Sequence, residues 1–252
     1  MLQRLASLIA FSVILINCFS TSPALSQKSA PIRFNPPPPP PDRGLPGNRG
    51  EGASRGDCTA LDLPLTALVP SYEQRLNQGA GETTITQVWG LTSVEQPSFW
   101  FYVPYNQSSI QAIEFVLKTD QNNAVPKIYQ YPQYLEWFEC NYKDYGFLET
   151  NKPYHWFFKV RVVCNPNQSA TLDYVEGWVQ RVNLDAALRD EFKQLLPQEQ
   201  ASIYAKNGIW YDALTTLAEL LLTGSQHLGV AEDWKNLLKV IKLEKMSTKL
   251  LI

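Results

Sequence analysis

Apolar and polar side chains alternate along much of the chain between Cys58 and Val182, most clearly in the segment YHWFFKVRVVC at residues 154–164. A strand sends successive side chains to opposite faces, so such a segment has one apolar and one polar face. The apolar face here comprises Tyr154, Trp156, Phe158, Val160, Val162 and Cys164. Shorter alternating segments, separated by turn residues, bring the total to about seven strands. The pattern predicts an antiparallel, immunoglobulin-like β-sandwich over residues 58–182.

The spacing of apolar residues changes to three and four after Asn183, as in amphipathic helices. Leu184, Leu188, Phe192 and Leu195 form one such stripe. Three further helices are expected over residues 197–207, 209–222 and 231–246. Residues 183–252 are therefore predicted to form a helical cap whose apolar stripes pack on one face of the sandwich, which makes the fold α+β.

The segment SFWFYVPY at residues 98–105 is aromatic on both faces. Phe99 and Phe101 share one face, which suits a strand over a core, whereas Trp100 and Tyr102 share the other. The second face either lies under the helical cap or, together with Trp89, forms an aromatic platform for a ligand. We prefer the first interpretation, because the helices need an apolar surface to cover.

The first 26 residues are typical of a secretory signal peptide. Arg4 precedes an uncharged apolar run, and Ala24, Leu25 and Ser26 suit signal peptidase, so we expect cleavage after Ser26. The alternative is lipidation at Cys18. No later segment is apolar enough to span a bilayer, so we expect no transmembrane segment after cleavage and a periplasmic or secreted protein.

Residues 27–57 are rich in proline and glycine, and Pro36–Pro41 are six consecutive prolines. This composition predicts a disordered linker that acts as a spacer. Two alternatives are that the proline run docks into an aromatic groove, or that Arg43, Arg49 and Arg55 bind an anionic polymer.

The charge balance argues against nucleic acid as a partner. Removal of Arg4 leaves 21 of the 22 Lys and Arg residues against 24 Asp and Glu, a net charge of −3. A nucleic-acid-binding protein would need a concentrated basic face instead.

Candidate catalytic and metal-binding residues are few. His155 and His227 are the two histidines; neither belongs to an HExxH motif, and His155 is interpreted as a partly covered strand residue that bonds a neighbour. No nucleophile elbow, phosphate-binding loop or dinucleotide fingerprint is found, so no metal, cofactor or catalytic residue is predicted. Four carboxylates are candidates for glycoside hydrolysis, but nothing singles out a pair: Glu114, Glu136, Glu139 and Glu176.

Two resemblances add to this picture. The segment ASIYAKNGIWYDALTTLAEL at residues 201–220 resembles a tetratricopeptide helical hairpin. The order of the blocks LTALVP, PSFWFYVPY, YHWFFKVRVVC and NGIWYDAL resembles the cyanobacterial domain-of-unknown-function family numbered 928. The second resemblance implies an exported protein with no assigned activity and no assigned catalytic residues.

These observations predict a non-enzymatic interaction or binding module of the cell envelope, whose partner is an unknown protein or an envelope glycan. One alternative is a carbohydrate-binding module that uses Trp89, Trp100 and Tyr102. Another is a glycan-acting hydrolase whose carboxylates converge only in the fold.

Three cysteines remain after signal cleavage, and we expect a disulfide between Cys58 and Cys164. Cys140 could instead pair with either one, or be a buried thiol. Peptide mass mapping of the secreted protein without reduction is expected to show the Cys58–Cys164 cross-link. Recovery of both cysteines as thiols would contradict the pairing.

Overall fold

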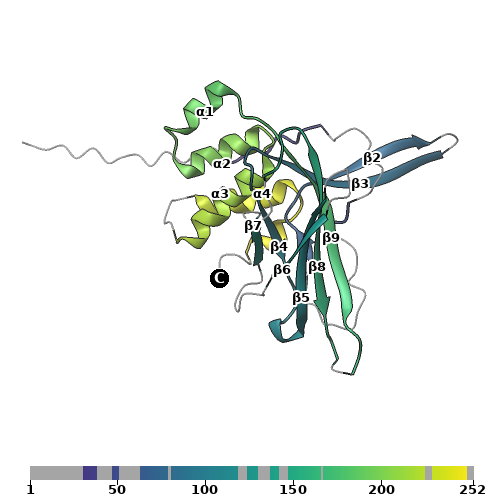
Figure 1. The fold of residues 1–252 in the computed structure, drawn as a ribbon. Coiled ribbons are helices and arrows are strands. Elements are labelled where there is room, and N and C mark those ends of the chain that lie inside the picture. Colours follow the sequence, from purple (N-terminus) through teal and green to yellow (C-terminus); the bar gives the residue numbers. More distant parts are fainter. Residues whose placement is uncertain are drawn as a thin grey trace, which may run out of the picture.

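The computed structural model describes residues 31–38, 47–50, 63–78, 81–118, 124–129, 137–141, 147–165, 167–224 and 229–248. These residues form a large sheet, a small sheet packed on one of its faces, and a group of helices beyond the small sheet (Figure 1). A hairpin of two strands projects from the large sheet (Figure 1). The α+β class predicted from the sequence is confirmed.

The large sheet has the strand order β2-β3-β9-β8-β5-β6. In that order the strands are β2 (Ser71–Gln78), β3 (Gly81–Thr92), β9 (Thr171–Arg181), β8 (Pro153–Val162), β5 (Ile110–Lys118) and β6 (Ala124–Tyr129). The expectation of a wholly antiparallel arrangement is wrong at one place, because β3 and β9 run parallel, with Trp89 opposite Trp178. A parallel pair needs a long crossover, and here the crossover contains two strands of the small sheet, β4 and β7, and three strands of the large one.

The small sheet consists of β1 (Thr66–Ala67), β4 (Ser98–Tyr102) and β7 (Trp137–Asn141), with β4 in the middle. Phe101 of β4 stacks on Phe158 of β8 with ring centroids 3.9 Å apart. Phe99 meets Phe115 of β5 at 4.8 Å. Alternation along β4 and β8 thus brings two apolar faces together, as expected for two packed sheets.

The helices are α1 (Ala186–Phe192), α2 (Pro197–Lys206), α3 (Trp210–Leu222) and α4 (Val230–Val240), with short 3₁₀ turns at Gln107–Ser109 and Glu244–Met246. Asp185 caps α1 by accepting the Ala187 N–H at 2.8 Å, and Pro197 occupies the first turn of α2. Gly208 follows α2 with φ of +73°, the left-handed conformation that glycine adopts readily.

The helices and the sheets share one hydrophobic core. The Trp100 indole donates a hydrogen bond of 3.0 Å to the Thr215 hydroxyl in α3. The Trp210 indole donates at 2.7 Å to the carbonyl of Leu68. The prediction that the outer face of β4 receives the helices is therefore confirmed at Trp100.

Residues 31–38 form an extended segment, here called the strap, that packs on the helices. Ile32 and Phe34 are only 4% and 8% exposed, and the Phe34 ring meets Trp210 edge-on at 5.0 Å. Asn35 donates its backbone N–H to the carbonyl of Ala205 at 3.1 Å and its side-chain amide to that of Lys206 at 2.8 Å. A disordered linker over all of 27–57 is therefore wrong for the strap, because Asn35 satisfies carbonyl groups at the end of α2.

Arg49 shows that residues 47–50 are also part of the folded body. The residue is 3% exposed, and its guanidinium group donates to the carbonyls of Ile241 at 2.9 Å and Val69 at 3.3 Å. Gly50 beside it has φ of +101°, and a Cβ there would lie 1.7 Å from the Leu65 carbonyl oxygen. The interpretation of Arg49 as a solvated linker residue is thus wrong.

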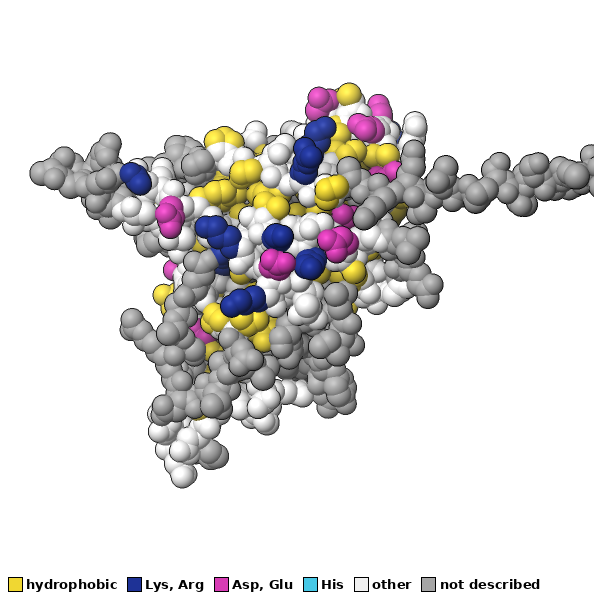
Figure 2. All heavy atoms as spheres, turned by 180° about the vertical axis from the view of Figure 1, so that it is seen from behind, with side chains coloured by type: hydrophobic (Ala, Val, Ile, Leu, Met, Phe, Trp, Pro, Cys, Tyr) yellow, Lys and Arg dark blue, Asp and Glu magenta, His cyan; other side chains and the backbone are white. Residues whose placement is uncertain are grey.

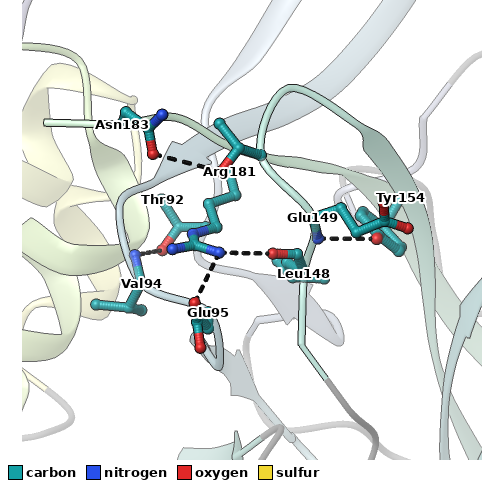
Figure 3. A network of polar contacts seen from close by, with 9 residues as sticks. Thr92, Val94, Glu95, Leu148, Glu149, Tyr154, Arg181 and Asn183 are labelled. Atoms are coloured by element: carbon teal, nitrogen blue, oxygen red, sulfur yellow. Dashed lines mark hydrogen bonds and ion pairs between the residues drawn. The ribbon is translucent and has the colours of Figure 1, made fainter.

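Arg181, the last residue of β9, fixes the junction between the sheet and the helices (Figure 3). Its guanidinium group donates to the Leu148 carbonyl at 3.0 Å and pairs with Glu95 at 3.0 Å. Nearby, the Glu149 N–H donates to the Tyr154 hydroxyl at 3.0 Å (Figure 3). Two loops are thus tied to the strand that leads into the cap.

Several predictions lie outside the described residues: the signal peptide and Cys18, the linker arginines Arg43 and Arg55, and Cys58, Glu136 and His227. Cys140 is a buried thiol, so Cys140 and Cys164 are not joined to each other, and the pairing of Cys58 with Cys164 stays a prediction. Among the described residues, no helix is long and apolar enough to cross a membrane.

Candidate functional site

The three aromatic residues proposed as a sugar platform are buried. Trp89, Trp100 and Tyr102 are 5%, 3% and 0% exposed. A ring must present an open face to stack on a sugar. These residues therefore belong to the packed interior and do not form an open platform.

His155 is buried on β8, where its Nε2 atom lies 2.9 Å from a carboxylate oxygen of Glu176 on β9. The imidazole ring stacks on Trp178 with centroids 4.4 Å apart. His155 is thus a strand residue in contact with a neighbouring carboxylate, as expected, but it is buried and not partly covered. In the described part of the chain, no group of three or more His, Cys, Asp or Glu could hold a metal ion.

The candidate hydrolase carboxylates have separate contacts. Glu114 on β5 faces Lys159 at 3.4 Å, and Glu139 on β7 accepts a hydrogen bond from Ser98. Glu139 lies in the small sheet, whereas Glu114 and Glu176 lie on the same face of the large sheet, on the two strands that flank β8. Glu176 contacts His155 at 2.9 Å, and not another carboxylate.

Asp212 is a buried carboxylate that sequence analysis did not single out. It lies in the first turn of α3 and accepts hydrogen bonds from the Thr92 hydroxyl at 2.7 Å and from the Ser93 N–H and hydroxyl. Burial raises the pKa of Asp212, and the bonds from Ser93 and Thr92 oppose that effect. The group clamps the β3–β4 loop to α3, beside a hollow of about 120 Å³ that includes Tyr204.

A larger groove, here called the α4 groove, lies where the strap, the base of the β2–β3 hairpin and the end of α4 meet. It has a volume of about 450 Å³. Its lining consists of Phe34, Pro36, Pro70, Ser71, Tyr72, Glu73, Thr86, Val240, Ile241 and Lys242. Three distant parts of the chain thus form one concave surface of mixed apolar and polar character.

A second hollow of about 430 Å³ adjoins the end of α4 and shares Lys242 with the α4 groove. Leu243 and Met246 are buried beneath it, while Lys239 and Lys245 are exposed beside it. Figure 2 views the molecule from behind and shows both basic and acidic side chains in the middle of that face, next to hydrophobic surface. The two hollows meet at Lys242.

Lys242 adopts an unusual backbone conformation, with φ of +64°. Its N–H donates to the Lys239 carbonyl at 3.0 Å, and the next N–H, of Leu243, reaches the Leu238 carbonyl at 2.9 Å. These bonds form the helix-ending motif in which glycine usually occupies the left-handed position. A side chain there costs about 1–2 kcal/mol.

Tyr72, which lines the α4 groove, has an inaccessible hydroxyl group. Its hydroxyl oxygen is buried and has no hydrogen-bond partner within the described segments, and burial raises the pKa of this phenol. An unsatisfied buried hydroxyl is unfavourable unless a ligand or water supplies an acceptor.

The fold is that of a two-sheet α+β protein with a group of C-terminal helices, and the strap, β2 and the end of α4 form a groove on it. The chain matches the family described as Domain of Unknown Function (DUF928) over residues 50–251 and belongs to it. No curated protein and no solved structure matches the chain.

The raised pKa of Asp212 makes the stability of the chain depend on pH. The folded state binds more protons than the unfolded state between the usual pKa of 3.8 and the folded pKa. Stability conferred by this group is therefore present below the usual pKa and lost as the pH rises through the folded pKa. The unfolding free energy of wild type minus that of Asp212→Asn is expected to fall, as the pH rises through that window, by about 1.4 kcal/mol per pH unit.

Urea denaturation across this range measures the effect. Thr92→Val removes a hydrogen bond that lowers the pKa of Asp212, so this variant should extend the decline to higher pH. A difference between wild type and Asp212→Asn that rises with pH would contradict the assignment.

Proposed function

We propose that this chain is a non-enzymatic interaction module of the cell envelope, exported by its N-terminal signal, and that the α4 groove is its recognition surface. The observation that carries the proposal is the construction of this groove from the strap, the hairpin base and the end of α4. The immunoglobulin-like relationship of the sheets and the tetratricopeptide-like relationship of the cap remain part of the proposal.

The groove has the mixed lining that recognition sites use. Val240 is 49% exposed at its rim, so an apolar contact is available to a partner. Ser71, Thr86 and Lys242 offer polar groups around the apolar residues. An apolar surface with a few polar groups can select a partner by shape and by hydrogen bonding.

The position of the groove also suits an interaction module. Arg49 holds the C-terminal end of α4 through the Ile241 carbonyl, and the strap is held at the end of α2 by Asn35. Two walls of the groove, the end of α4 and the strap, are thus held in place by hydrogen bonds to other parts of the fold. A preformed surface loses less conformational entropy on binding than a disordered one does.

The carbohydrate-binding and hydrolase alternatives have less support. The first named Trp89, Trp100 and Tyr102, which are buried. The second needs two carboxylates across one cleft, whereas Glu73 is the one carboxylate among the described residues that line the α4 groove.

Site-specific photo-cross-linking in the native cell tests the proposal. A photoreactive phenylalanine analogue replaces Val240 in the groove or, as the control, Leu222 at the end of α3. The two side chains are 49% and 50% exposed, and Leu222 lies outside the groove lining. We expect a discrete protein adduct from position 240 and none from position 222.

Equal cross-linking from the two positions, or none from position 240, would contradict the proposed surface. A position-240 adduct that a glycosidase removes would instead support the carbohydrate-binding alternative.

A further inference from the structure

We infer that the α4 groove binds an extended acidic peptide segment of a partner protein, which pairs with the outer edge of β2 and places its carboxylates against Lys242 and its neighbours. This inference rests on the proposed function, because it names the partner class for the same groove. Three features of the described chain carry it: the strand edge, the lysines and the conformation of Lys242.

The edge of β2 provides backbone groups for an added strand. β2 is the terminal strand of the large sheet and pairs with β3 on one side. The consecutive residues Ser71, Tyr72 and Glu73 all line the groove. The start of β2 therefore forms one wall of the groove. An extended peptide in the groove can thus continue the sheet, a common mode of peptide recognition.

The charge of the surface specifies an acidic partner. Lys239, Lys242 and Lys245 are exposed, and all three line the second hollow, whereas Lys242 also lines the α4 groove. The described residues contain no ion pair for any of these lysines. Two carboxylates, Glu73 and Glu244, line the same hollows. The surface therefore has a positive excess within a chain whose overall charge is −2. Electrostatic complementarity of this kind selects partners and accelerates their association.

The backbone of Lys242 indicates that its side chain is functional. Glycine would fit the left-handed position at the end of α4 without strain, yet lysine stands there with φ of +64° and lines both hollows. Strained backbone conformations concentrate at binding sites. A lysine near a helix C-terminus also interacts favourably with the helix dipole, so a test must separate this structural role from binding.

An extended peptide thus pairs with the strand edge and places its carboxylates against the lysines. An acidic glycan or a flat anionic membrane would leave the strand edge unpaired.

The test measures binding of a short fluorescent peptide in which glutamate and valine alternate, by anisotropy, to the full-length mature protein. The matched probe has lysine in place of glutamate. We expect binding of the acidic probe alone, weakened about tenfold between roughly 50 mM and 500 mM salt, because exposed charges are screened.

The variants separate binding from folding. Lys242→Glu should weaken the acidic probe about tenfold or more, whereas Lys235→Glu, an equal charge change on the exposed face of α4 outside both hollows, should leave affinity within about twofold. Lys242→Gly should raise the thermal unfolding midpoint, because the strain is removed, and still lose most of the affinity.

Equal affinity of wild type and Lys242→Glu, or of the two probes, would overturn the inference. So would Lys242-dependent binding of anionic phospholipid vesicles or of an acidic polysaccharide without binding of the acidic probe. If these failures occur while the position-240 adduct persists, the groove is an interaction surface with a different partner class. If the adduct itself is absent, the proposed function fails.

Discussion

The burial of β4 on both of its faces is the constraint on which the rest of the structure depends. Phe99 and Phe101 fill the space between the two sheets, whereas Trp100 on the opposite face bonds to Thr215 in α3. Each large aromatic side chain buried in this way contributes on the order of 2 kcal/mol. The short strand β4 thus joins the large sheet, the small sheet and the helices. Separating either the small sheet or the helices from this core would expose aromatic side chains to water.

Buried polar contacts then fix how the layers are oriented, which the non-directional hydrophobic effect alone does not do. Asp212 ties the start of α3 to the β3–β4 loop, Arg49 ties the end of α4 to the chain near Val69, and Arg181 ties the end of β9 to two loops. The α4 groove is a consequence of these contacts, because Arg49 helps to place α4 beside the base of β2. The contacts that hold the α4 groove in shape are therefore also contacts of the folded core.

Periodicity predicted those features that depend on neighbouring residues. The alternation through Trp156, Phe158 and Val160 identified β8, and the spacing after Asn183 identified the helices and their position on β4. The strap was missed because the proline run hid the alternation of Ile32 and Phe34, which was the available signal. The parallel pairing of β3 with β9 was missed because strand direction is set by distant partners, not by local pattern.

Native-state hydrogen exchange of α3 and β8 amides, followed against denaturant, tests most directly whether sheets and helices form one body around β4. If they do, the slowest amides of both elements exchange through the same global opening and converge on one free energy of unfolding. Exchange of the α3 amides at a free energy several kcal/mol lower, while β8 stays protected, would contradict a shared core.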